Sequence, residues 1–273
     1  MKLSLALVGC GAIGSALLKG WLTLSNSEQS FENFWIVTPH RKSVEPFLED
    51  PRVRWFSSPE HLPQAPEIIV FAVKPLLLEG ILPSYKVFDS LMISVVTGKS
   101  IAFYEKFLSS SHLIIRAMPN IPVAIHKGVI GLFTHACLKT MHKTFISTCF
   151  HNLGFCTWLR SEDEIDKITA LSGSGPAYVY YFIESFIHSA ESLGFTKEVA
   201  AHLALHTFWG ASSYAHDLDE SPEIARQHVT SSKGTTAAAL EILTTGHLDQ
   251  LIDTAVKAAY TRAKEIGYEK ESL

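Results

Sequence analysis

Residues Leu3–Gly20 read LSLALVGCGAIGSALLKG, and this stretch decides the fold. An apolar run of strand length leads into three glycines with G-x-G-x-x-G spacing, and a helical pattern follows. In such a turn Gly9 permits a tight bend, Gly11 lets a pyrophosphate approach the backbone, and Gly14 allows close packing of helix on strand. The free N–H groups at the helix start attract phosphate. The stretch therefore predicts a dinucleotide-binding turn.

A bacterial lipoprotein signal is a second interpretation of the same residues, since Lys2 and an apolar run precede Cys10. The charged region is a single lysine, the apolar run is short, and an amphipathic helix rather than a polar linker follows Cys10. We therefore expect no secretory signal and a cytoplasmic protein. The four cysteines form no C-x-x-C pair, which is typical of reduced thiols.

Composition narrows the class of protein. The chain has 273 residues, of which 47% are hydrophobic and 18% charged, and this length is enough for two modest domains or one large one. No uninterrupted apolar run approaches the roughly 18 residues of a membrane span. The net charge of −4 gives no support for nucleic-acid binding. Residues 1–160 carry 15 Lys/Arg and 10 Asp/Glu, whereas residues 161–273 carry 8 and 17. A basic first part suits an anionic cofactor, although differing solvated surfaces would produce the same asymmetry.

The first 160 residues alternate between strand and helix patterns, which predicts a Rossmann-like parallel sheet with helices on both faces. The expected strands are Leu3–Val8, Phe34–Thr38, Glu67–Val73, Leu91–Val96, His112–Met118 and Gly128–Phe133, and the expected helices include Ile13–Leu24, Ser43–Leu48 and Ile101–Leu108. The strands are continuously apolar, as in a sheet that is covered on both faces.

From residue 161 onward only helix signals remain. Ser161 with Glu164 has the capping-box spacing, Gly194 ends a helix, and Thr196 and Ser221 are helix caps. We therefore predict an α/β domain over 1–160, which binds the dinucleotide, and an all-α domain over 161–273. His202 and His206 lie on one helix face, but no third ligand accompanies them, so no metal site is expected.

The end of the second strand selects the dinucleotide. An acidic residue there binds the ribose of NAD, whereas a nearby arginine accommodates the 2′-phosphate of NADP. Here the strand ends in Thr38 and is followed by Arg41 and Lys42, with no carboxylate. We predict NADPH, with NADH as a weaker alternative. The other interpretation of Arg41 and Lys42 is an exposed turn. Lys74, at the end of a later strand, is read as structural or phosphate-facing rather than catalytic.

Six separate stretches together resemble one family, the pyrroline-5-carboxylate reductases. They are GCGAIG at 9–14, AVKP at 72–75, SVVTG at 94–98, RAMPNIP at 116–122, LSGSGPAY at 171–178 and VTSSKGTT at 229–236. The first is common to many oxidoreductases. The fourth, fifth and sixth are much more particular to this family, and the matches are spread over nearly the whole chain.

The resemblance implies NADPH-dependent hydride transfer to C5 of 1-pyrroline-5-carboxylate, which gives L-proline. It also implies a small-molecule substrate and a homodimer through the C-terminal helices, with higher assembly in some members. Carried over by position, the cofactor residues are Gly9, Gly11, Ala12, Ile13, Gly14, Thr38, Arg41, Ala72, Val73, Lys74, Pro75, Met118, Pro119 and Asn120. The substrate residues are Ser231, Gly234, Thr235 and Thr236, and Glu162 also approaches the substrate.

Thr236 is the candidate catalytic residue, with its hydroxyl hydrogen-bonded to the substrate nitrogen. A hydroxyl is a poor general acid at neutral pH, so positioning matters more than proton transfer. A helix cap formed by Thr235 or Thr236 is the alternative. The chain departs from the family at Lys233, which replaces a glycine, and at His228. Two other functions stay open: reduction of another small imine or hydroxy acid, and NADP binding without catalysis.

Overall fold

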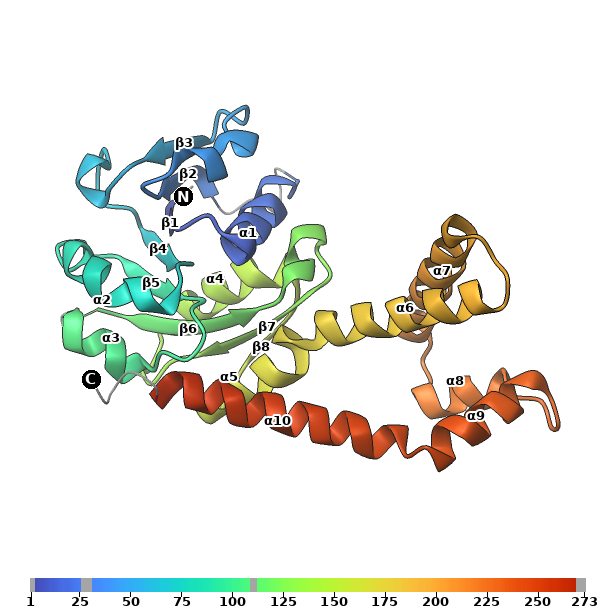
Figure 1. Ribbon diagram of the computed structural model, residues 1–273. Helices are drawn as coiled ribbons and strands as arrows, with labels where there is room; N and C mark the ends of the chain where they lie inside the picture. Colours follow the sequence, from blue (N-terminus) through green and yellow to red (C-terminus); the bar gives the residue numbers. More distant parts are fainter. Residues whose placement is uncertain (1–2, 26–30, 109–111, 269–273) are drawn as a thin grey trace. The chain divides into compact units, whose positions relative to one another are not determined.

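The computed structural model describes residues 3–25, 31–108 and 112–268 (Figure 1). Its strands are β1 (Leu3–Val8), β2 (Phe31–Val37), β3 (Val53–Phe56), β4 (Ile68–Phe71), β5 (Leu91–Ser94), β6 (Ile114–Pro119), β7 (Gly128–Phe133) and β8 (Gly154–Trp158). Its α-helices are α1 (Ala12–Leu22), α2 (Leu78–Ile81), α3 (Ile101–Phe107), α4 (Thr140–His151), α5 (Asp163–Ile168), α6 (Gly175–Ser192), α7 (Lys197–Asp217), α8 (Pro222–His228), α9 (Thr235–Thr245) and α10 (Leu248–Tyr268). None of these helices is long and apolar enough to cross a membrane.

One sheet of eight strands organises the first part of the chain, in the order β3-β2-β1-β4-β5-β6-β7-β8. The strands from β3 to β6 are parallel. The direction of winding reverses between β1 and β4, and ligands of such sheets bind beyond the carboxyl ends of the strands at this point. The glycine turn follows β1 directly, so the sheet places it at the switch point. The predicted Rossmann-like fold is confirmed.

The expectation of a wholly parallel sheet is wrong at β7, which runs antiparallel to β6. Only eight residues connect these two strands, and a parallel crossover needs a dozen or more. β8 then pairs with β7 in parallel. The predicted strands also omitted β3 and β8, which are short and only partly buried. The helix expected over Ser43–Leu48 is instead two short 3₁₀ turns, since Pro46 has no N–H to donate.

Alternate residues of each strand fill separate cores on the two faces of the sheet. Leu5 and Leu7 of β1 lie in the core that includes α1 and α4, whereas Ala6 and Val8 lie in the core that includes α2, α3 and α5. Trp21 of α1 is 1% exposed, and its indole N–H donates to the Cys149 carbonyl of α4 at 3.0 Å. Burial on both faces fixes the strand register, because a slip of one residue would exchange the two faces.

The chain divides into two compact units. The first contains the residues up to Ser174 together with the end of α10 from Ala259, and the second contains Gly175–Ala258. The boundaries between these compact units lie after Ser174 and before Ala259 rather than at residue 160. The reason is that α5 packs on the sheet and α10 ends in the first unit. The functional assignment of 1–160 and 161–273 stays a prediction.

The second unit consists of helices, as predicted. Gly194 ends α6 with φ +97°, and the Thr196 and Ser221 hydroxyls accept from the N–H groups of Val199 and Ile224. The predicted capping box of Ser161 and Glu164 is wrong. The Glu164 carboxylate accepts from Arg160 N at 2.8 Å, and Glu164 N donates to the Ser161 carbonyl rather than to its hydroxyl.

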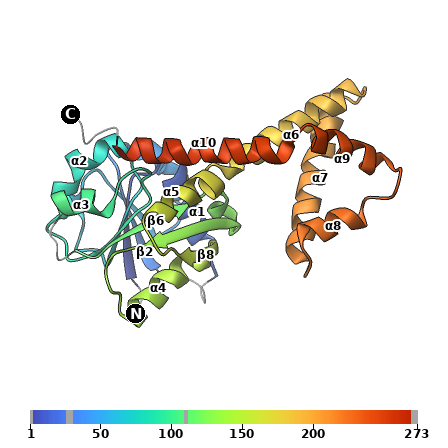
Figure 2. The ribbon, with the colours of Figure 1, turned by 90° about the horizontal axis from the view of Figure 1, so that it is seen from below.

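The end of α10 is fastened to α5 within the first unit (Figure 2). The Tyr260 hydroxyl donates to Asp163 Oδ1 at 2.5 Å, and Lys264 Nζ lies 3.3 Å from the same oxygen. Lys167, one turn along α5, is 2.7 Å from Asp163 Oδ2. Hydrogen bonds from Lys167 and then from Tyr260 hold the pKa of Asp163 at about 2, below its ordinary value of 3.8.

We expect Asp163→Asn to be less stable than the parent chain at pH 7, by less than about 1 kcal/mol because the carboxylate is partly exposed. A carboxylate with a lowered pKa contributes stability above its ordinary pKa and loses it as the pH falls through the lowered value. The difference should therefore shrink as the pH falls below about 4 and vanish only below pH 2. Urea unfolding at several pH values measures it, with exposed Asp89→Asn as the control. A difference that persists unchanged at low pH would refute this role.

Candidate active site

The three glycines of the β1–α1 turn differ in what surrounds the position of the missing Cβ atom. Gly9 has φ +91°, and a Cβ there would lie 2.7 Å from the Ala72 carbonyl oxygen. A Cβ on Gly14 would lie 2.6 Å from the Gly9 carbonyl oxygen. A Cβ on Gly11 would meet nothing within 4 Å. The chain's own packing thus requires two of the glycines, while the third borders open space.

Gly11 is also the N-cap residue of α1, with ordinary extended backbone angles and no side-chain cap. The first N–H groups of a helix have no intrahelical acceptor, so those of Ala12 and Ile13 are donors at an exposed helix start. Together with the helix dipole, this arrangement favours an anion. The open side of Gly11 is where a pyrophosphate can reach these donors.

The residues expected to select the cofactor follow β2. Thr38 is half-buried, and its carbonyl accepts from the Trp55 indole N–H at 2.9 Å. Arg41 is exposed, with its guanidinium 5.9 Å from the centre of the Trp55 ring, and it makes no ion pair with the described residues. Trp55 is the residue that sequence reasoning missed here. The alternating Val-Arg-Trp-Phe of β3 is the signal that would have found it.

The residues that follow β4 contact the glycine turn. Ala72 N donates to the Val8 carbonyl at 2.8 Å, which joins the carboxyl ends of β4 and β1. Val73 is half-buried and Lys74 is exposed. Pro75 opens a 3₁₀ turn, Pro75–Leu77, and so ends the extended segment. The AVKP stretch therefore lies at the switch point, next to Gly9.

Met118, Pro119 and Asn120 come at the end of β6 and beyond it. Asn120 is buried, and its amide bridges two elements: Nδ2 donates to the Ser172 carbonyl at 3.0 Å, and Oδ1 accepts from Val129 N at 2.9 Å. Ser172 belongs to a π-helical turn, Thr169–Gly173, formed by the LSG motif. The side chain of Asn120 therefore braces β6 against this turn, and its contact with a cofactor stays a prediction.

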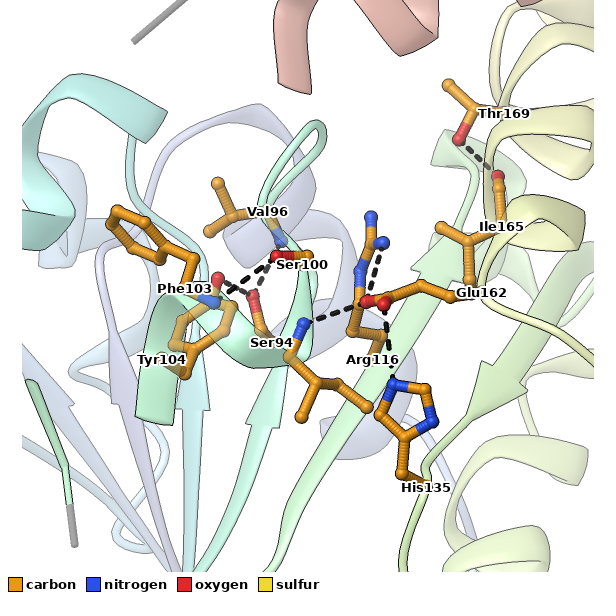
Figure 3. A network of polar contacts seen from close by, with 11 residues as sticks. Ser94, Val96, Ser100, Phe103, Tyr104, Arg116, His135, Glu162, Ile165 and Thr169 are labelled. Atoms are coloured by element: carbon orange, nitrogen blue, oxygen red, sulfur yellow. Dashed lines mark hydrogen bonds and ion pairs between the residues drawn. The ribbon is translucent and has the colours of Figure 1, made fainter. Parts of the chain in front are cut away.

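Glu162 is at the centre of a polar network in the first unit (Figure 3). Its Oε1 accepts from Ile101 N at 2.7 Å and from Arg116 Nη1 at 3.1 Å, and its Oε2 lies 3.5 Å from His135 Nε2. Arg116 is 4% exposed. Glu162 thus neutralises a buried cation and joins β6 to the start of α3, a structural role that sequence reasoning did not anticipate. Its approach to a substrate stays a prediction.

A second group of hydroxyls holds the loop after β5. Ser94 Oγ accepts from Val96 N at 3.1 Å and forms a short hydrogen bond with the Tyr104 hydroxyl (Figure 3). Burial raises the pKa of Tyr104 well above its ordinary value. The tyrosine is therefore a neutral brace at this end of the sheet.

The predicted substrate residues lie in the second unit, at the start of α9. Gly234 is the N-cap, and its N–H donates to the Ser231 carbonyl at 3.1 Å. Neither Thr235 nor Thr236 caps the helix, so that alternative is wrong. Lys233 has φ +61°, the left-handed conformation that a glycine adopts more easily. His228 Nδ1 lies 3.4 Å from Glu220 Oε2. The start of α9 thus offers free N–H groups and the hydroxyls of Thr235 and Thr236.

Comparison with known proteins agrees with this arrangement. The family model for pyrroline-5-carboxylate reductase dimerisation matches residues 162–266, and the model named NADP oxidoreductase, coenzyme F420-dependent, matches residues 4–98. The pyrroline-5-carboxylate reductase of Pseudomonas aeruginosa is 31% identical over 205 residues, which are 74% of this chain and 75% of that protein. The chain belongs to the pyrroline-5-carboxylate reductase family.

Solved structures of pyrroline-5-carboxylate reductases extend the likeness to nearly the whole chain. The Coxiella burnetii enzyme superposes with a TM-score of 0.87 at 31% identity, covering 97% of this chain and 99% of that one. The Plasmodium falciparum enzyme, whose crystal structure has NADP bound, gives a TM-score of 0.84 at 29% identity and covers 97% and 98%. The predicted family and fold class are confirmed, and the chain is an oxidoreductase with an NADP-type first domain.

The described residues contain no group of three His, Cys, Asp or Glu side chains that could hold a metal ion. The four cysteines all lie among the described residues and form no disulfide; Cys10 and Cys149 are buried and Cys137 is exposed. Burial raises the pKa of Cys10, next to Gly11, so that this thiol stays protonated in the nucleotide turn.

Proposed function

We propose that this chain catalyses the NADPH-dependent reduction of 1-pyrroline-5-carboxylate to L-proline, the last step of proline biosynthesis. The observation that carries the proposal is the open approach to Gly11, at the switch point of a fold shared along its length with these reductases. NADPH supplies the hydride, which goes to the imine carbon C5. The chain has to bind the cofactor, orient the substrate and exclude water.

Different groups of residues bind different parts of the cofactor. Gly11, Ala12 and Ile13 offer backbone N–H groups to the pyrophosphate. Thr38 and Arg41 would hold the adenosine ribose, and the Arg41 guanidinium, which makes no ion pair with the described residues, would supply the charge that the 2′-phosphate of NADPH needs. The stretches Ala72–Pro75 and Met118–Asn120 line the nicotinamide half.

The start of α9 holds the substrate. Its carboxylate accepts from the N–H groups that follow Gly234, with Ser231 beside them. Thr236 hydrogen-bonds the ring nitrogen, and Lys233 adds a cation near the carboxylate. Glu162, which also bonds to Arg116 and to Ile101 N, is the residue of the first unit that approaches the substrate.

We also propose that two copies associate through their C-terminal helices, in the cytoplasm. Large apolar side chains of the second unit are exposed in the single chain, among them Trp209 at 69%, Ile242 at 71% and Leu251 at 65%. The concentration of exposed large apolar side chains in one unit indicates a protein interface. Sedimentation of the purified chain tests this, and a monomer at micromolar concentration would contradict it.

Loss of NADPH absorbance with 1-pyrroline-5-carboxylate tests the reaction, with other cyclic imines and small keto acids in parallel. We expect turnover that is fastest with 1-pyrroline-5-carboxylate. Turnover confined to another imine or to a keto acid would favour a different reductase on this fold. Tight NADPH binding without turnover would favour a cofactor-binding protein that has lost catalysis.

We expect Arg41→Ala to weaken NADPH binding by about 10- to 100-fold, since hydrogen bonds to charged groups contribute roughly 1.5–3 kcal/mol. NADH binding should be unchanged because NADH has no 2′-phosphate. Fluorescence titration with both cofactors measures this. Arg54→Ala, an exposed arginine over Phe56 on the neighbouring strand, is the matched control. Equal NADPH affinity in Arg41→Ala and the parent chain would overturn the assignment.

We expect Thr236→Ala to lower kcat by about tenfold, as for the loss of one positioning hydrogen bond, with NADPH affinity unchanged. Thr236→Ser keeps a hydroxyl and should restore most of the rate. Thr245→Ala, at the other end of α9, is the control for loss of a threonine. Full turnover in Thr236→Ala would show that this hydroxyl has no part in the reaction.

A further inference from the structure

A cavity of about 600 Å³ lies within the first unit, and its lining includes none of Gly9, Gly11 and Gly14. Its walls come from the loop after β5, from α3 and α5, and from the end of α10. The residues that line it are Glu79, Gly98, Lys99, Ser100, Phe103, Lys106, Phe107, Arg116, Glu162, Asp163, Asp166, Lys264 and Gly267. The proposed reaction uses none of them as a direct contact to cofactor or substrate except Glu162, and that carboxylate is bonded to Arg116 and Ile101.

The loop that carries Lys99 is held against the end of α10. Gly98 has φ +74°, and a Cβ there would lie 2.6 Å from Ile266 Cγ2. Lys99 follows directly and is only 4% exposed, with its Nζ 4.2 Å from the centre of the Phe103 ring. The ammonium is thus placed in the cavity wall by packing and not by a surface ion pair.

Several charges around the cavity neutralise one another. Arg116 pairs with Glu162 at 3.1 Å, and Lys264 pairs with Asp163 at 3.3 Å. Lys99 makes no ion pair with any described residue, although burying a cation without an anion is costly. The Phe103 ring compensates only part of that cost, since cation–π contacts are weaker than an anion partner.

Asp166, on the α5 side of the same cavity, is the complementary group. It is half-buried and forms no ion pair with the described residues. Burial raises its pKa, an effect that the nearby Arg116 opposes. Among the described residues, the cavity wall therefore presents the unpaired cation of Lys99, the unpaired carboxylate of Asp166, and the rings of Phe103 and Phe107, whose centres are 5.2 Å apart. The carboxylate of Glu79 also lines the cavity but is exposed.

We propose that this cavity binds a free α-amino acid with an apolar side chain. The ligand's carboxylate pairs with Lys99 Nζ, its ammonium pairs with Asp166, and its side chain packs on Phe103 and Phe107. A dianion would meet Asp166 with like charge, and a simple cation would leave Lys99 unpaired. A zwitterion satisfies both groups at once. No residue of this site belongs to the start of α9, and the proposal does not depend on the reaction proposed above.

Calorimetric titration of L-leucine into the full chain, without cofactor or substrate, tests the proposal. We expect saturable binding that weakens at least tenfold in Lys99→Met and in Asp166→Asn. The control Lys86→Met, at an exposed position, should bind L-leucine as the parent does. Thr236→Ala should also bind it normally, which separates this cavity from the proposed substrate site.

Leucine analogues make the test independent of whether a variant folds. 4-Methylpentanoate keeps the carboxylate and the side chain without the ammonium, and isopentylamine keeps the ammonium and the side chain without the carboxylate. We expect both to bind at least tenfold more weakly than L-leucine. The proposal is overturned if L-leucine does not bind, if 4-methylpentanoate binds equally well, or if binding survives in a folded Lys99→Met that retains NADPH affinity.

Discussion

Gly11→Ala is expected to weaken NADPH binding by about 5- to 150-fold, the equivalent of the roughly 1–3 kcal/mol that overpacking costs. The protein itself has room for this methyl group, because nothing lies within 4 Å of the position that it would occupy. The residue's backbone angles, φ −81° and ψ −162°, are accessible to alanine. Thermal unfolding without cofactor should therefore change little, by about 1 kcal/mol at most.

Gly9→Ala is the matched variant, because it should lower the stability of the fold, whereas Gly11→Ala should lower the affinity for NADPH. Its Cβ would collide with the Ala72 carbonyl, and its φ of +91° is strained for alanine, so the fold itself should lose stability. NADPH titration and thermal unfolding of the two variants separate ligand approach from packing. If Gly11→Ala bound NADPH as tightly as the parent chain, the pyrophosphate could not lie against this backbone.

Glu162→Gln is expected to destabilise the fold by about 3 kcal/mol, since it leaves the Arg116 cation buried without its anion. Glutamine can still accept from Ile101 N, so the substitution removes the charge and keeps the shape. For a chain of this size such a loss corresponds to a fall in Tm of roughly 6–12 °C. Thermal unfolding, monitored by circular dichroism, measures it.

Two variants control this experiment. Glu79→Gln removes an exposed carboxylate at the rim of the same cavity and should leave Tm unchanged. Adding Arg116→Met to Glu162→Gln removes the stranded cation and should recover part of the loss, because replacing both partners of a buried pair is far less costly than removing one. An unchanged Tm in Glu162→Gln would show that the pair contributes no stability.

The fold could be predicted where local pattern and packing agree. The glycine spacing after β1, the apolar strands and the helix caps at Thr196 and Ser221 all follow from short-range chemistry. β3 and β8 were missed because they are short edge strands with little burial. The antiparallel β7 depends on the length of its connection to β6, which the apolar pattern of each strand does not contain.

The sequence predicted which residues make up the candidate site better than it predicted what each of them does. Gly9, Gly11 and Gly14 look equivalent in the motif, and only the surrounding atoms show that Gly11 alone borders open space. Asn120 and Glu162 were expected at ligands, yet their polar atoms bind other parts of the protein. These two bonds join residues that are 52 and 61 positions apart, which no local pattern reveals.

Deuterium transfer tests the central claim most directly. NADPH carrying deuterium at both C4 positions of the nicotinamide would be incubated with 1-pyrroline-5-carboxylate and the purified chain, and the product analysed by NMR. The proposed reaction predicts L-proline with one deuterium at C5 and an equal amount of NADP⁺. No proline, or proline without deuterium at C5, from a chain that binds NADPH would contradict it.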